Sequence, residues 1–74
     1  MPKLPRVTAR EIAGALEKAG FSLVRQSGSH RIYKNPAGKR VTVPFHGSKT
    51  LHPKLLKNIL RDAAWNPADL EKLL

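Results

Sequence analysis

The stretch FSLVRQSGSHRIYKNPAGKRVTVPF, residues 21–45, decides the fold of this 74-residue chain. Apolar and polar residues alternate over Arg40–Phe45, and the whole stretch is interrupted at Gly28-Ser29 and at Pro36-Ala37-Gly38 by residues typical of turns. We therefore expect three short strands, joined by tight connections, to form an antiparallel meander. The predicted strands are Phe21–Gln26, His30–Asn35 and Arg40–Phe45.

The pairing of the second and third strands follows from where their hairpin closes. If Asn35 pairs with Arg40, Ile32 faces Val43, and this apolar pair favours that register. Pro44 has no N–H to donate to a neighbouring strand. It should therefore lie on an edge strand or at the end of a strand.

Helices are predicted before and after the meander. Thr8 and Glu11 form a capping box, and apolar residues then recur at helical spacing up to Gly20, which predicts a helix over residues 9–19. Pro53 is suited to the first position of a second helix, and Asn66-Pro67 to the start of a short third one. The apolar stripe of the second helix consists of Leu56, Ile59, Leu60 and Ala63. The last helix is expected to pack through Leu70, Leu73 and Leu74.

This order of elements predicts an α+β sandwich, with two helices on one face of a three-stranded antiparallel sheet and a short C-terminal helix. We expect one domain over residues 1–74, because a chain of this size supports only one small core. The absence of cysteine excludes a disulfide, a cysteine nucleophile and a thiolate zinc site. With no apolar export segment and no run of about 20 apolar residues, the expected location is the cytoplasm.

Positive charge is concentrated in the middle of the chain. There are 14 Lys and Arg residues against 5 Asp and Glu, and no acid lies between Lys18 and Arg61. Such a charge distribution attracts a polyanion and favours a nucleic acid as partner. The alternative is that the charge only keeps the surface solvated. A membrane-surface role is disfavoured because no helix places basic residues opposite bulky aromatic ones.

The histidines are the remaining candidates for catalysis. None of them stands at a metal-ligand spacing from an acid, so we expect neither a metal site nor a cofactor. A histidine transfers protons near neutral pH, while Lys and Arg hold a phosphate. These groups suffice for RNA cleavage because the RNA 2′-OH is itself the nucleophile, and DNA, which lacks this hydroxyl, would not be cleaved.

His30 is the best placed histidine. It follows Gly28-Ser29 at the start of the second strand, where a glycine permits a phosphate to approach closely. A histidine at a strand edge is also commonly structural. In the register above, His30 lies opposite Phe45 and His46 points to the other face, which disfavours a catalytic histidine pair across the hairpin. His52 is expected to cap the second helix.

Several segments resemble the HicA family in order and spacing. They are Gly20-Phe21, Gly28-Ser29-His30, Pro36-Ala37-Gly38, Val43-Pro44-Phe45-His46 and Leu56 to Ala63, with further similarity in Leu4–Thr8 and Leu70–Leu74. The likeness thus extends over nearly the whole chain. It implies a double-stranded-RNA-binding-like α-β-β-β-α fold and a toxin that cleaves messenger RNA. It also implies inhibition by a HicB-type antitoxin, with a monomeric free toxin that forms a hetero-oligomer with the antitoxin.

The resemblance also implies a site. The family's catalytic histidine maps onto His30, and a second family histidine maps onto His46; Gly28, Ser29 and His46 are candidates for a catalytic or substrate-positioning role. The basic residues expected to bind RNA phosphates are Arg25, Arg31, Lys34 and Lys49. The chain departs from the family at Ala63-Ala64-Trp65, where the family tends to end its helix with Ala-Gly. This departure leaves open whether the helix continues and whether Trp65 packs on the core or on a partner.

The leading hypothesis is a metal-independent endoribonuclease of messenger RNA, with His30 as general acid or base. The alternative is a non-catalytic RNA-binding module of the same fold, which would bind RNA without turnover. A small DNA-binding regulator is a third possibility, in which Lys54, Lys57 and Arg61 contact phosphates. The meander before that helix is not a helix-turn-helix, which disfavours this third function.

Overall fold

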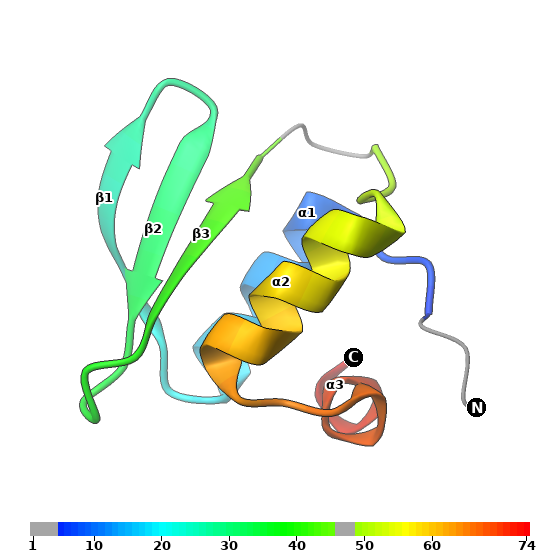
Figure 1. Ribbon diagram of the computed structural model, residues 1–74. Helices are drawn as coiled ribbons and strands as arrows, with labels where there is room; N and C mark the ends of the chain where they lie inside the picture. Colours follow the sequence, from blue (N-terminus) through cyan, green and yellow to red (C-terminus); the bar gives the residue numbers. More distant parts are fainter. Residues whose placement is uncertain (1–4, 46–48) are drawn as a thin grey trace.

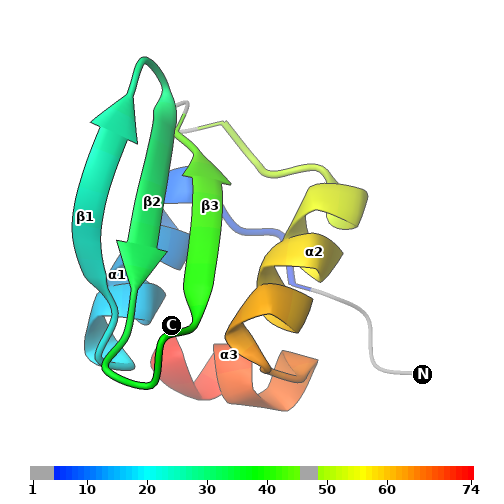
Figure 2. The same cartoon turned by 60° about the vertical axis from the view of Figure 1, so that its left-hand side comes forward.

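The computed structural model describes residues 5–45 and 49–74. Its elements are α1 (Ala9–Lys18), β1 (Ser22–Ser27), β2 (His30–Lys34), β3 (Arg40–Pro44), α2 (Pro53–Ala63) and α3 (Pro67–Leu73). The strands form one antiparallel sheet with β2 in the centre. Helices α1 and α2 both lie on one face of this sheet, and α3 packs against α1 (Figures 1 and 2). The predicted α+β architecture is confirmed.

The first helix begins at Ala9 as its local sequence predicts and ends at Lys18, one residue before the predicted end, with Ala19 as its C-cap. The Thr8 hydroxyl accepts a hydrogen bond from the Glu11 N–H at 3.1 Å, and the Glu11 carboxylate accepts one from the Thr8 N–H at 3.0 Å. After the helix, Gly20 adopts a φ of +96°, which favours glycine, and the Phe21 N–H donates to the Leu16 carbonyl. These contacts satisfy backbone groups that a helix end otherwise leaves without partners.

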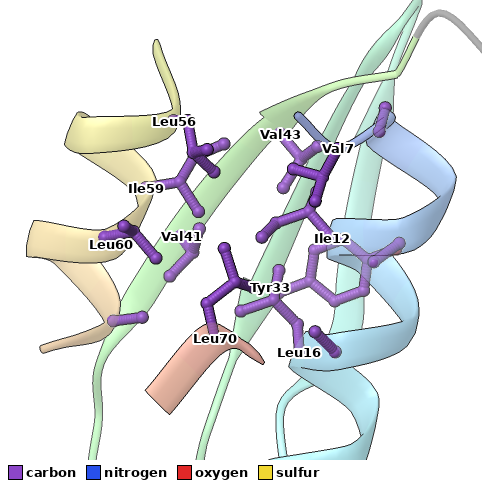
Figure 3. Close-up of a cluster of buried hydrophobic side chains, with 14 of the residues drawn as sticks. Val7, Ile12, Leu16, Tyr33, Val41, Val43, Leu56, Ile59, Leu60 and Leu70 are labelled. Atoms are coloured by element: carbon purple, nitrogen blue, oxygen red, sulfur yellow. The ribbon is translucent and has the colours of Figure 1, made fainter. Parts of the chain in front are cut away.

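The core lies between the sheet and the helices (Figure 3). Its largest fully buried side chains are Val7, Ile12, Leu16, Tyr33, Val41, Val43, Leu56, Ile59 and Leu70. Burial of each aliphatic side chain contributes about 1.5–3 kcal/mol relative to exposure. The predicted stripe of α2 is buried in full. Of the three predicted contacts of α3, Leu70 is buried and Leu73 half-buried, but Leu74 is 47% exposed because it follows the last helical residue.

Helix α2 does not continue through Trp65. Ala64 adopts the left-handed conformation, with φ 61° and ψ 38°, and the Trp65 N–H donates to the Leu60 carbonyl at 2.8 Å. This geometry turns the half-buried Trp65 back onto the body of the protein. Its ring meets Phe21 edge-on, with ring centroids 6.0 Å apart. Trp65 therefore packs on the core.

The register of β2 and β3 differs by one residue from the prediction. The Asn35 N–H donates to the Lys39 carbonyl at 3.1 Å, and the Asn35 side chain accepts from the Lys39 N–H at 2.8 Å. The hairpin thus closes on Asn35 and Lys39 rather than on Asn35 and Arg40. Gly38, with a φ of +86°, takes the left-handed position of a three-residue hairpin loop.

The corrected register changes which residues share a face of the sheet. Ile32 pairs with Thr42 rather than Val43, and His30 pairs with Pro44 rather than Phe45. Because successive side chains alternate between faces, a shift of one residue exchanges the partners across the sheet. The argument that placed His46 on the face opposite His30 therefore no longer holds. His46 itself lies outside the described residues.

Pro44 fulfils both parts of its prediction, since it is the last residue of the edge strand β3. Within residues 5–45 and 49–74, no helix combines the length and the apolar character that crossing a bilayer requires.

Candidate functional site

His30 is the first residue of the central strand and its side chain is exposed. It is paired with Ser27 of β1 and Pro44 of β3. Because Tyr33 of the same strand points into the core, alternation places His30, like Ile32 and Lys34, on the opposite face. We call this side of the sheet the uncovered face, because no described helix lies over it. Figure 2 views the sheet from this side, with α1 behind it.

The turn before His30 explains the Gly28-Ser29 motif. These two residues connect β1 to β2, and Gly28 has a φ of +58°, whereas Ser29 has no positive φ. A two-residue hairpin with a positive φ only at its first central position is a type II′ turn, which strongly favours glycine there. The predicted role of Gly28 was to permit a phosphate to approach. In the structure its immediate role is to form the turn.

The end of β3 holds this turn in place. The Phe45 N–H donates a hydrogen bond to the Ser29 carbonyl, which extends the pairing of β2 and β3 beyond His30. On the other side, the Gln26 side-chain amide donates to the Gly28 carbonyl at 3.4 Å. The backbone at His30 is therefore supported on both sides. No hydrogen bond joins its imidazole to another described residue, so the ring is open to a ligand.

Arg31 lies on the other side of the sheet from His30. It pairs with the buried Val43, and its guanidinium carbon lies 3.7 Å from the centre of the Phe45 ring. Such a cation–π contact contributes about 0.5–2 kcal/mol. Among the described residues the buried Nε of Arg31 has no hydrogen-bond partner. Arg31 is thus part of the packing around Phe45, and the structure does not place it beside His30 on the uncovered face.

Three cations come together on the uncovered face: Arg25 of β1, Lys34 of β2 and Arg40 of β3. Together with Val24 and Ile32 they line an open hollow of about 380 Å³. We call Arg25, Lys34 and Arg40 the cationic cluster. Arg25 and Lys34 were expected from the sequence, whereas Arg40 was not. A sequence prediction that closed the hairpin correctly would have identified Arg40, because that closure pairs Arg40 directly with Lys34.

A β-bulge brings Arg25 into this cluster. Leu23 pairs with Tyr33, but Arg25 pairs with Ile32, so Val24 is an extra residue in β1. Without the bulge, Arg25 would lie on the same side as Leu23, towards the helices. The extra residue turns the Arg25 side chain onto the uncovered face. Bulges are common next to active sites because they redirect a side chain in this way.

No carboxylate belongs to this sheet. All the acids of the chain lie on helices, namely Glu11, Glu17, Asp62, Asp69 and Glu71. Glu11 and Asp69 are further engaged in capping boxes. The cationic cluster is therefore not neutralised by any acid of the strands that carry it.

The other predicted residues lie elsewhere. Lys49 is exposed in the segment before α2, where the Leu51 N–H donates to the Val7 carbonyl at 2.8 Å. His52 caps α2 as predicted, because its Nδ1 accepts a hydrogen bond from the Lys54 N–H at 3.1 Å. In the part of the chain that the structure describes, no three His, Cys, Asp or Glu side chains gather as a metal site would require.

Comparison with known proteins adds one match. The family model for the HicA toxin of bacterial toxin–antitoxin systems matches residues 9–65. The matched range includes α1, the whole sheet and α2, and with them His30 and the cationic cluster. The expected similarity of Leu4–Thr8 and Leu70–Leu74 lies outside this range. A search of curated proteins gives no match.

Proposed function

This chain belongs to the HicA toxin family, and on that basis we propose that it is a metal-independent endoribonuclease that cleaves messenger RNA through His30. Beyond family membership, one structural observation carries the proposal. The exposed imidazole of His30 shares the uncovered face with three cations that no carboxylate of the sheet neutralises. A proton-transfer group and phosphate-binding groups are thus open to the same polyanion.

The reaction needs few protein groups. The RNA 2′ oxygen attacks the adjacent phosphorus and forms a bond to it, while the bond from phosphorus to the 5′ oxygen breaks. The products are a 2′,3′-cyclic phosphate and a 5′-hydroxyl. As general base, the neutral His30 imidazole accepts the proton of the 2′-OH, and water protonates the leaving 5′ oxygen. As general acid, the protonated ring would instead donate to the leaving oxygen, and water would take the 2′-OH proton.

The decisive experiment compares His30→Ala with His52→Asn on a single-stranded RNA in the presence of EDTA. We expect His30→Ala to reduce the cleavage rate by about 10²–10⁴-fold. Its circular dichroism should be unchanged because the side chain is exposed. His52→Asn is the matched control, since it also removes a histidine but keeps a good helix cap. It should cleave like the unmodified chain.

Two outcomes would contradict the proposal. One is undiminished cleavage by His30→Ala. The other is cleavage of a strand with 2′-deoxy sugars, which lacks the attacking hydroxyl. Binding of RNA by the freshly purified protein without any cleavage would instead support the non-catalytic RNA-binding module.

An antitoxin is the partner that membership of this family implies. We propose that it is of the HicB type, that it binds the free, monomeric toxin in the cytoplasm, and that the product is a hetero-oligomer. The candidate antitoxin to test is the product of the gene that lies next to the gene for this chain. We expect expression of this chain alone to inhibit growth and co-expression of the two proteins to abolish that inhibition. Light scattering should show a complex larger than either protein alone.

A further inference from the structure

We propose that the cationic cluster is a subsite for single-stranded RNA that binds phosphates one to two nucleotides away from the bond cleaved at His30. The inference rests on the proposed function, because it assigns to that reaction a substrate-positioning site distinct from the catalytic residue. It is built from Arg25, Lys34 and Arg40 around Ile32. Arg40 is the new member, and Arg31 and Lys49 are not part of it.

The distance along β2 separates the cluster from the reacting atoms. Lys34 lies four residues after His30 in the same strand, and a strand rises about 3.3 Å per residue. The Lys34–Arg40 pair is therefore displaced by about 13 Å from His30 along the strand. Arg25, opposite Ile32, is displaced by about half as much. These cations are thus placed for neighbouring phosphates rather than for the phosphate under attack.

The spacing within the cluster suits one extended strand of nucleic acid. Directly paired residues have Cβ atoms about 4.5–5.5 Å apart, and diagonal neighbours lie about 7–8 Å apart, with somewhat shorter distances between their Cβ atoms. Lys34 and Arg40 form a direct pair, and Arg25 is diagonal to Lys34. These separations are comparable with those between consecutive phosphates of a single strand. Double-stranded RNA is instead recognised across two successive minor grooves over about 16 base pairs, far more than this hollow spans.

Among the described residues, the hollow of the cationic cluster offers phosphate contacts but has no Phe, Tyr or Trp ring in its lining. The aromatic residues are Phe21, Tyr33, Phe45 and Trp65, and none of them lines the hollow. Tyr33 is in the core, Phe45 lies under Arg31, and Phe21 and Trp65 pack on each other. Sequence preference along single strands commonly comes from stacking and base-edge contacts. We therefore expect this subsite to bind RNA with little dependence on its base sequence.

The first test is binding of a short single-stranded 2′-O-methyl RNA, which cannot be cleaved. The variant Arg25→Gln/Lys34→Gln/Arg40→Gln is compared with Arg10→Gln/Lys18→Gln/Lys72→Gln, which removes the same charge from helices α1 and α3. We expect the cluster variant to bind about tenfold more weakly or worse. Its salt-dependence slope should be smaller by about 2, at about 0.7 per lost contact. The helix variant should lose much less on both measures.

The second test uses turnover and separates positioning from catalysis. On a six-nucleotide RNA the cluster variant should raise KM with little change in kcat, because its cations contact phosphates that do not react. On a dinucleotide, which has no neighbouring phosphates, the variant should behave like the unmodified chain. If the chain cleaves no RNA at all, the proposed function fails, but the binding test still decides on the subsite.

Three results would overturn the inference. The cluster variant and the helix variant could weaken RNA binding equally, which would indicate only a loss of net charge. Duplex RNA could bind as tightly as the single strand and with the same dependence on the cluster. The substitutions could also leave RNA binding and KM unchanged while weakening the complex with the antitoxin, which would identify the cluster as a protein interface.

Discussion

Lys34 of β2 stands directly opposite Arg40 of β3, so two positive charges form a cross-strand pair with no carboxylate in the sheet to separate them. Like charges in this arrangement destabilise a sheet, whereas opposite charges at the same positions stabilise it. The RNA phosphates of the proposed subsite would supply the negative charge that this pair lacks. The same pair is the end of the cationic cluster that lies farther from His30.

The first prediction follows from this pair. Arg40→Glu replaces like charges by opposite ones and should raise the free energy of unfolding by about 0.2–1 kcal/mol, as measured by urea denaturation at low salt. It should weaken RNA binding at the same time. Lys39→Glu makes the same charge change in the adjoining loop and should affect stability less. A loss of stability in Arg40→Glu would show that the like-charge pair carries no energetic penalty.

The second prediction concerns the end of α2. Ala64 is the one non-glycine residue with a positive φ in the described ranges. A left-handed conformation costs an L-residue about 1–2 kcal/mol, and substitution by glycine removes this cost. Glycine also raises the conformational entropy of the unfolded chain, which cancels about half of that gain. Ala64→Gly should therefore stabilise the protein by about 0.5–1 kcal/mol and raise Tm by about 2–8 °C. Calorimetry measures this difference.

A comparison variant makes this result specific to the backbone conformation. Ala68→Gly makes the same change within α3, where φ is helical, and should lower Tm. If both variants lower Tm, the left-handed angle of Ala64 is not a source of strain.

The third prediction concerns Gly28. A Cβ at this position would meet no atom within 4 Å, so any effect of Gly28→Ala arises from the φ of +58° rather than from a clash. We expect a loss of about 1–2 kcal/mol in unfolding free energy. Cleavage should fall as well, because the turn positions His30. Ser29→Ala, in the same turn with no positive φ, should change stability by less than about 0.5 kcal/mol. Equal stability of the two variants would contradict the assigned turn.

The fourth prediction concerns Trp65. Removal of its half-buried ring also removes the edge-on contact with Phe21, so Trp65→Ala should destabilise the protein by about 2–3 kcal/mol. Trp65→Phe keeps an aromatic partner for Phe21, and its loss of unfolding free energy should be less than half of the loss in Trp65→Ala. Chemical denaturation of both variants gives the comparison. If Trp65→Ala left the stability unchanged, the ring would contribute to binding of a partner rather than to packing of the core.

Much of the fold was predictable because its signals are local. The capping box of Thr8 and Glu11 involves residues three apart, and the buried stripe of α2 follows from helical spacing alone. Gly28-Ser29 and Pro36-Ala37-Gly38 interrupt the strands where the structure has turns. His30 was identified as the candidate catalytic residue from its sequence context, and its exposure on the uncovered face is compatible with that proposal.

The sequence by itself therefore determined the order of the elements, the buried stripe of α2 and the positive charge of the middle of the chain. Only the tertiary structure decided which side chains share the uncovered face. A hairpin that closes on Lys39 instead of Arg40 shifts the register by one residue, and the bulge at Val24 shifts it again for Arg25. Each shift reverses the side to which a residue points, because side chains alternate along a strand. Loop closure and bulges depend on how whole strands meet, so local spacing could not place Arg40 beside Lys34 or turn Arg25 onto the face that carries Lys34.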